Sequence, residues 1–206
     1  GSVDTTAPEI TVDAPDNTND NTPTITGTTD APEGSVVTVV VTDSDGNTQT
    51  VTTTVDSDGN YSVDVPEALP EGEYTVDASV KDPAGNEGKA TDKGNVDTTA
   101  PAITVDAPDN TNDNTPTITG TTDAPEGSVV TVVVTDSDGN TQTVTTTVDS
   151  DGNYSVDVPE ALPEGEYTVD ASVKDPAGNE GKATDKGSVD TTAPSAPVVE
   201  IQDGGD

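Results

Sequence analysis

Apolar and polar residues alternate with a period of two in short segments along the first half of the chain, and this alternation predicts β-strands. In residues 61–65, for example, Tyr and Val share one face, while Ser62 and Asp64 share the other. Turn-forming residues separate the segments, and no segment has the 3.6-residue apolar period of a helix. The expected strands are residues 9–14, 22–28, 35–42, 48–55, 61–65, 73–81 and 87–95.

The whole pattern then occurs a second time. Residues 4–96 and 97–189 are identical except at two positions, and a third copy begins at Asp190. About seven short strands in a unit of this size are typical of an immunoglobulin-like β-sandwich. A recent duplication would leave the same pattern, but near-identical repeats of domain size favour a role that belongs to the array. The two differences are Glu9 against Ala102 and Asn95 against Ser188.

We therefore expect an all-β chain of tandem immunoglobulin-like β-sandwich domains, about seven strands each, arranged end to end. The expected domains are residues 1–96 and 97–189, with 190–206 as a linker and the start of a following domain. The turn before Tyr74 also suggests a tyrosine corner, although an ordinary inward-facing tyrosine fits the same pattern.

The composition predicts a thin core. Phe, Trp, Met and Cys are absent, so Val, Ile, Ala and Tyr must supply nearly all of the buried surface. A domain of this size is marginally stable even with an ordinary core, so an additional stabilising element is expected. Without cysteine it cannot be a disulfide, and without histidine the usual zinc ligand and general base are absent.

Carboxylates dominate the charge of the chain and are the main candidates for binding chemistry. The formal net charge is −35, and the first repeat has 19 acidic residues against three lysines. Such a charge argues against nucleic acid and anionic membranes as partners, and no apolar stretch is long enough for direct membrane insertion. A merely solvated surface would explain the carboxylates, but their concentration in loops favours a hard cation, above all Ca2+.

The order of strands in a sandwich brings several acidic loops to the two ends of each domain. Asp4, Asp30 or Glu33, Asp56, Asp58 and Asp82 are expected at one end, and the loop at residues 16–21 at the other. In a head-to-tail array, four carboxylates from neighbouring domains could then meet at one ion, although the Asp-Pro-Ala-Gly-Asn loop is also simply a good β-turn. These four are Asp20, Asp97, Asp123 and Asp175.

Other acidic motifs favour structure over chemistry. Asp-Ser-Asp-Gly-Asn, at residues 43–47 and 56–60, is too short for an EF-hand and is typical of a hairpin turn. Paired carboxylates could suggest a glycosidase, but the sequence offers no aromatic platform for a sugar. A serine nucleophile would lack a histidine base. We therefore expect no enzymatic activity.

The motifs in their order resemble a known group of repeats. DTTAP, NTPTITGTTDAPEG, SDGNYS, LPEGEYTV and DPAGN are similar to the bacterial Ig-like extender repeats of large secreted RTX adhesins. In that family, tandem repeats project a distal binding region from the bacterial surface for cell adhesion and biofilm formation, and calcium at the junctions makes the array rigid. The resemblance implies calcium ligands at Asp4, Asp97 and Asp190 in DTTAP, and at Asp82 and Asp175 in DPAGN. Asp30 and Asp123 match the pattern less closely, and Asp20 with its counterpart Asp113 is added on the geometric argument alone.

The prediction is a calcium-rigidified, non-catalytic spacer of an extracellular adhesin on the bacterial cell surface. Its partners would be the neighbouring repeats of the same chain, and the chain itself would be a monomer. The alternative is an adhesive module that recognises a glycan, a protein or ice through its β-sheet face, for which the Thr-rich residues 50–54 are the best candidates. Homophilic adhesion would need a free edge strand or an anchoring side chain, neither of which the sequence pattern identifies.

Overall fold

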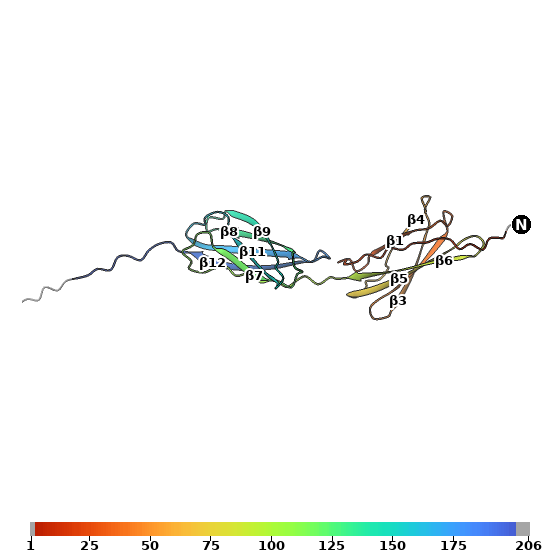
Figure 1. Cartoon of the computed structure of the whole chain (residues 1–206), viewed down its shortest axis with the longest axis horizontal. Helices are drawn as coiled ribbons and strands as arrows, with labels where there is room; N and C mark the ends of the chain where they lie inside the picture. Colours follow the sequence, from red (N-terminus) through yellow and green to blue (C-terminus); the bar gives the residue numbers. More distant parts are fainter. Residues whose placement is uncertain (1–2, 201–206) are drawn as a thin grey trace, which may run out of the picture. The chain divides into compact units, whose positions relative to one another are not determined.

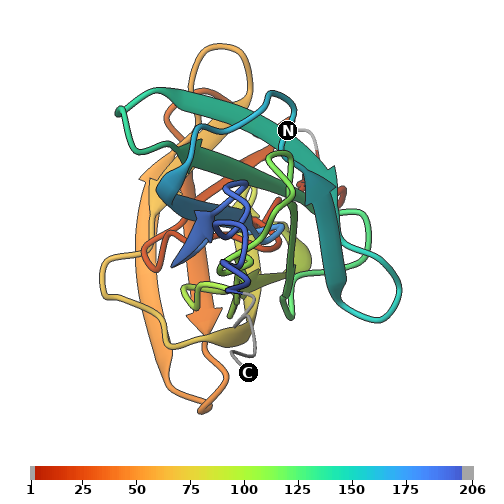
Figure 2. The same ribbon diagram turned by 90° about the vertical axis from the view of Figure 1, so that its left-hand side faces the viewer.

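The computed structural model describes residues 3–200, in which every regular element is a strand. The predicted all-β class and the tandem sandwiches are therefore confirmed (Figures 1 and 2). No helix among the described residues is long and apolar enough to cross a membrane. The described residues form two compact units: one extends to Ala100 and includes Lys174–Glu180, and the other consists of Pro101–Val173 and the residues from Gly181 onward.

Each repeat contains a four-stranded and a two-stranded antiparallel sheet. In the first repeat the strand orders are β3-β2-β5-β6 and β1-β4, and in the second they are β12-β11-β8-β9 and β10-β7. The strands of the first repeat are β1 (Thr24–Thr28), β2 (Val36–Thr42), β3 (Thr48–Thr54), β4 (Asn60–Asp64), β5 (Gly72–Lys81) and β6 (Glu87–Val96). Those of the second are β7 (Thr117–Thr121), β8 (Val129–Thr135), β9 (Thr141–Thr147), β10 (Asn153–Asp157), β11 (Gly165–Lys174) and β12 (Glu180–Val189).

Six of the seven predicted strands are present, with ends within two residues of the prediction. The strand expected at residues 9–14 is wrong, because this part forms only isolated bridges from Ile10 to Thr29 and from Asp13 to Thr26. Carboxylates take the N–H groups at its two ends: that of Glu9 donates to Asp30 (2.8 Å) and that of Ala14 donates to Asp92 (2.9 Å). Proline, which has no N–H, stands at each end of the segment.

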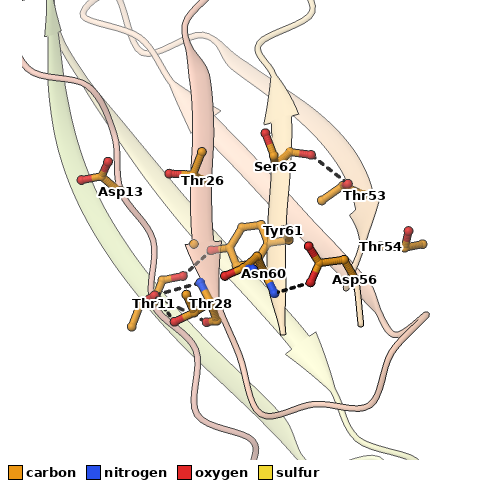
Figure 3. A pocket seen from close by; sticks show the side chains of 11 residues that line it. Thr11, Asp13, Thr26, Thr28, Thr53, Thr54, Asp56, Asn60, Tyr61 and Ser62 are labelled. Atoms are coloured by element: carbon orange, nitrogen blue, oxygen red, sulfur yellow. Dashed lines mark hydrogen bonds between the residues drawn. The ribbon is translucent and has the colours of Figure 1, made fainter. Parts of the chain in front are cut away.

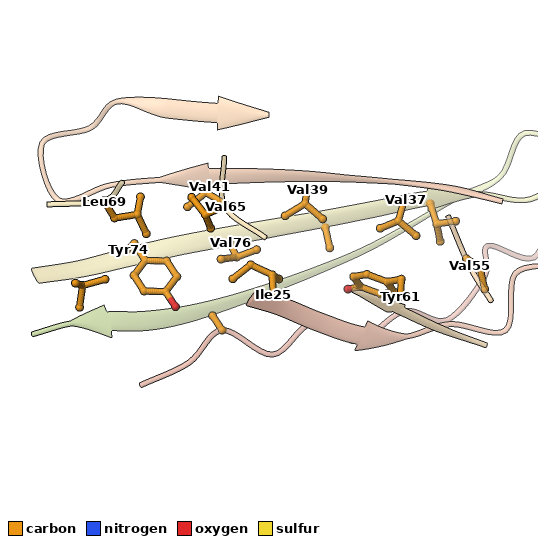
Figure 4. Packing of buried hydrophobic residues seen from close by; sticks show 14 of the residues in the cluster. Ile25, Val37, Val39, Val41, Val55, Tyr61, Val65, Leu69, Tyr74 and Val76 are labelled. Carbon is orange, nitrogen blue, oxygen red and sulfur yellow. The ribbon is translucent and has the colours of Figure 1, made fainter. Parts of the chain in front are cut away.

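The core consists of the inward faces that the alternation predicts. Val37, Val39 and Val41 of β2 are each 0% exposed, and Figure 4 shows Ile25 between Tyr74 and Tyr61 in the same cluster. Full burial of one such apolar side chain contributes about 1.5–3 kcal/mol. Valine thus replaces the missing Phe, Trp and Met, and the same core is built in the second repeat.

The segment of residues 8–15, here called the first segment, lies with its backbone against three glycines. A Cβ atom on Gly88 would overlap the carbonyl of Pro8, and Cβ atoms on Gly27 and Gly94 would overlap two further carbonyls of the first segment. We call Gly27, Gly88 and Gly94 the glycine track. Its counterpart in the second repeat is Gly120, Gly181 and Gly187.

Two buried tyrosines fasten the first segment to this track. Tyr61 pairs with Gly27 across β4 and β1, and its hydroxyl donates to the carbonyl of Thr11. Tyr74 pairs with Gly94 across β5 and β6, and its hydroxyl donates to the carbonyl of Pro15 at 3.0 Å. Burial raises the pKa of both hydroxyls to about 12.

The acceptor of Tyr74 also corrects the tyrosine-corner interpretation. In that motif the hydroxyl bonds to backbone a few residues upstream, whereas here the acceptor Pro15 is 59 residues away. The tyrosine faces inward, as the alternative reading allowed.

The glycine track predicts a specific packing defect. In Gly94→Ala the new methyl group would collide with the Tyr74 ring and the Pro15 carbonyl, so the first unit should lose about 1–3 kcal/mol of stability. The second unit retains its equivalent Gly187 and serves as an internal reference in thermal unfolding followed by calorimetry. Lys93→Ala, at an exposed position of the same strand, should change stability by no more than about 0.5 kcal/mol. Equal effects of the two substitutions would contradict the packing role.

Candidate metal site at the repeat boundary

The boundary between the repeats is the pentapeptide at residues 97–101, which follows the last residue of β6 directly. Val96 forms a parallel bridge with Thr18, and the N–H of Asp97 donates to the carbonyl of Thr18 at 2.9 Å. The acidic loop at residues 16–21 is therefore attached by its backbone to the boundary that follows it. The same contacts recur at the next boundary, where the Asp190 N–H donates to Thr111 at 2.8 Å.

The pentapeptide is held by a carboxylate that the sequence analysis did not single out. One oxygen of Glu71 accepts from the Thr98 N–H (2.9 Å), the Thr98 hydroxyl (2.5 Å) and the Thr99 hydroxyl (2.7 Å). These donors, the Thr98 hydroxyl first, lower the pKa of Glu71. Glu164 makes the equivalent contacts with the residues after Asp190.

The register of β5 and β6 explains why Glu71 reaches the boundary. Gly72 pairs with Val96, so the residue before β5 lies beside the residues after β6. Asp97 completes the turn by accepting the Thr99 N–H at 3.1 Å. Two hydroxyl residues, one position beyond the end of β6, are the sequence signal that could have revealed this contact.

The loop between β5 and β6 is connected to the start of its own repeat. Asp82 accepts the backbone N–H and the side-chain amide of Asn86, both at 2.8 Å, and that amide also donates to the Asp4 carbonyl at 3.2 Å. The Asn86 side chain is the main cause of a lowered pKa at Asp82. One amide thus brings together oxygens of two predicted ligands.

The second repeat has the same connection. The Asn179 amide donates to Asp175 at 2.9 Å and to the Asp97 carbonyl at 2.8 Å. Asp20, Asp97 and Asp175 also belong to one compact unit. Asn86 and Asn179 were part of a predicted loop motif, but their bonding role was not foreseen.

The carboxylates of the remaining predicted ligands accept hydrogen bonds from backbone N–H groups. Asp123 accepts the N–H of Ala102 at 2.8 Å, as Asp30 in the first repeat accepts that of Glu9, the first N–H of the first segment. Asp20 accepts the N–H of Thr22 at 2.9 Å, and Asp113 repeats this contact with Thr115. Each carboxylate therefore has one structural partner and retains further acceptor capacity.

The donor chemistry fits calcium, because carboxylates and main-chain carbonyls are the oxygens that this ion prefers. Calcium takes about 6–8 such oxygens, however, and the described residues contain no group of three or more acidic side chains arranged to hold a metal. The nine predicted ligands therefore stay a prediction. All the lysines of the repeats lie on the long strands of the four-stranded sheets, so the boundary carboxylates have no lysine in their own loops.

A second candidate is a hollow of about 610 Å3 on the two-stranded sheet of the first repeat, with a counterpart of about 580 Å3 in the second (Figure 3). Threonine hydroxyls, Asp13 and Asp56 line it. Several of its polar groups bond within the protein: Thr11 to the Thr28 hydroxyl at 2.8 Å, and Asp56 to the Asn60 N–H at 2.8 Å. These hydrogen bonds stabilise the fold around the hollow, and they do not indicate which ligand it would bind.

Comparison with known sequences gives one family. A family model of the bacterial Ig-like domain matches residues 3–107 and again residues 103–191. No curated protein is significantly similar to the chain.

Three solved structures are similar to the chain over most of its length. The tetra-tandem repeat in the extending region of a large adhesion protein is 38% identical over 93% of this chain and 51% of that one, with a TM-score of 0.43. A Ca2+-stabilized adhesin that helps an Antarctic bacterium reach out and bind ice is 28% identical over 92% and 51%, with a TM-score of 0.51. A structure that gives insight into the host cell surface retention of a 1.5-MDa bacterial ice-binding adhesin is 25% identical over 90% of this chain and 66% of that one, with a TM-score of 0.45. The chain spans about half the length of the first two.

The contacts of Glu71 give a prediction for the boundary. In Glu71→Ala the Thr98 amide loses its acceptor, so its protection from hydrogen exchange should fall at neutral pH. Because the folded-state pKa of Glu71 is lowered from 4.5, its stabilisation is present above pH 4.5 and is lost as the pH falls through the folded-state value. Amide exchange measured by NMR checks both effects. Glu73→Ala, a neighbouring exposed substitution, should leave Thr98 unchanged; unchanged protection in Glu71→Ala would rule out the contact.

Proposed function

The chain belongs to the bacterial Ig-like domain family, and on that premise we propose that it is a non-catalytic spacer in a larger adhesin, with calcium at the repeat boundaries restricting hinge motion. The resemblance to extender repeats of large adhesins, drawn from its motifs, is confirmed. A spacer needs repeated units of constant size whose junctions resist bending. The near-identity of the two repeats supplies the first of these requirements.

The observation that carries the proposal is the double attachment of the boundary pentapeptide. Glu71 binds its threonines from the preceding repeat, and Asn179 binds the Asp97 carbonyl from the following repeat's loop. A linker fixed by side chains has fewer accessible conformations than a free one, so its ordering is part of the fold. A bound cation would add further contacts to this attachment.

Calcium would act on the charge that remains. Each repeat carries 18 or 19 acidic residues against three lysines, and carboxylates crowded at a boundary repel one another. The ligands would be Asp4 and Asp82 at the first boundary, Asp97 and Asp175 at the second, and Asp190 at the third. Asp30, Asp123, Asp20 and Asp113 would contribute from the adjoining loops. The bound ion would neutralise charge and cross-link these loops to the pentapeptide.

The similarity to an adhesin described as Ca2+-stabilized supports this assignment. Extracellular calcium modules bind at about 10⁻⁴–10⁻³ M, an affinity that leaves them empty inside a cell and filled outside. We therefore place the chain outside the cell, on the bacterial surface, as one part of a protein whose distal region makes the adhesive contact.

Small-angle scattering and thermal unfolding with calcium or EDTA test the proposal. Calcium at 100 times its Kd should stabilise the chain by about 2.7 kcal/mol, and the distribution of interatomic distances should become that of a straighter, stiffer particle. The double variant Asp97→Asn with Asp175→Asn should lose most of the scattering response, because it removes two ligand charges at the boundary between the repeats. Part of the thermal response should remain, since the ligands at the other boundaries are unchanged. Asp138→Asn, at the tip of a hairpin, should retain them. Identical melting temperatures and scattering in calcium and EDTA would refute the calcium role.

A further inference from the structure

The strand β3 is a free sheet edge. It lies at the end of the order β3-β2-β5-β6, and within residues 3–200 its ladder partner is β2 alone. In the second repeat β9 has the same position beside β8. A free edge presents a row of backbone donors and acceptors on which another strand can pair.

The register identifies these groups. The N–H of Val55 donates to Ser35, and that of Asp43 donates to Asn47, so both ends of the β2–β3 hairpin are hydrogen-bonded pairs. Such pairs alternate along an antiparallel ladder, so the odd-numbered residues of β3 bond to β2. The backbone groups of the even-numbered residues therefore point away from β2. These residues, all exposed, are Thr48, Thr50, Thr52 and Thr54.

The edge lacks the usual protection against pairing. Natural edge strands carry lysine, proline or bulges that block a second strand. Here β3 reads Thr-Gln-Thr-Val-Thr-Thr-Thr, and neither it nor β2 contains a charged residue, in a chain that is 23% charged. Val36, which pairs with Thr54 next to the edge, is 56% exposed, and its counterpart Val129 is 55% exposed.

Charge also makes this the side on which two copies can approach. The three lysines of the first repeat lie on β5 and β6, in the same sheet as β3, whereas most of the 19 acidic residues lie elsewhere. Other sides of two such domains would repel each other. The uncharged β2–β3 hairpin strands avoid that cost.

We propose that β3 pairs antiparallel with β3 of a second copy of this chain, and that β9 offers the same edge. The strand is self-complementary: when Val51 faces Val51, all of Thr48–Thr54 is paired and Thr50 forms hydrogen-bonded pairs with Thr52 of the other copy. The result is a continuous sheet that joins neighbouring chains side by side. It supplies the edge strand that homophilic adhesion requires, and it replaces the expectation of a monomer. With two edges per chain, weak contacts add by avidity.

The flanking hairpins oppose this pairing. Each end of β3 leads into an acidic turn, with Asp45 at one end and Asp58 at the other, and antiparallel pairing brings the turn of one copy near the opposite turn of its neighbour. Salt screens exposed charges over about 10 Å at 0.1 M. Association should therefore increase with ionic strength, unlike association driven by opposite charges.

Sedimentation velocity of the whole chain in EDTA, over a range of concentrations at 0.05 and 0.5 M NaCl, tests the proposal without calcium. We expect species of twice the 20.7 kDa monomer mass or larger, with association at least tenfold tighter at high salt. Thr50→Lys with Thr143→Lys should weaken it at least tenfold, because each copy then places a lysine opposite Thr52 of its neighbour, and the two lysine charges lie diagonally across the same edge. Thr26→Lys with Thr119→Lys makes the same charge change at exposed positions of the other sheets and should leave it intact. A chain monomeric under all conditions, or unaffected by the edge lysines, would overturn the proposal.

Cysteine trapping tests the register. Chains with Thr50→Cys and Thr143→Cys, mixed with chains carrying Thr52→Cys and Thr145→Cys, should form the mixed disulfide at least tenfold faster than either forms disulfides with itself. Directly opposed residues of a hydrogen-bonded pair lie about 5.5 Å apart at Cα, within disulfide range, whereas a two-residue offset is too long. Equal rates of mixed and self disulfides would overturn the register.

Discussion

The close approach of the first segment to the glycine track is the constraint on which each repeat depends. Three carbonyls of residues 8–15 occupy the space where Gly27, Gly88 and Gly94 have no side chain, and the hydroxyls of Tyr61 and Tyr74 bind two of these carbonyls. The tyrosines lie over two of these glycines, Gly27 and Gly94, so ring packing and hydroxyl bonding act together at these two positions. In a domain without Phe, Trp or Met, this close approach lets backbone fill space that side chains would otherwise occupy.

The packing of this segment on the glycines also bears on the boundary between the repeats. In the second repeat the counterpart of the first segment, residues 101–108, begins with the last residue of the pentapeptide. Glu71 binds Thr98 before it, and Asp123 binds Ala102 within it. Contacts that hold this segment therefore also hold the end of the pentapeptide from which it begins. Calcium and lateral pairing would act at different places: the ion at the acidic loops, and a neighbouring chain at the uncharged edge of β3.

The sequence predicted what depends on local pattern. Period-two alternation placed Tyr61, Val63 and Val65 on one face, and turn chemistry identified the loop of Asp82. Contacts between distant residues could not be read in this way. Asp92 accepts the Ala14 N–H, 78 residues away, at the end of the expected strand, and Glu71 reaches Thr98 because β5 and β6 are in register. The free edge of β3 likewise follows from sheet order, which alternation does not reveal.

Amide hydrogen exchange of Thr11 and Asp13 tests the central claim most directly. These amides donate to Thr28 and Thr26, each at 2.8 Å, in a segment that forms no continuous strand. If the glycine track and the tyrosine hydroxyls hold the segment, both amides will exchange as slowly as those of Val39 in the central strand β2, through opening of the whole unit. Exchange at the rate of an open loop, while Val39 stays protected, would contradict the account.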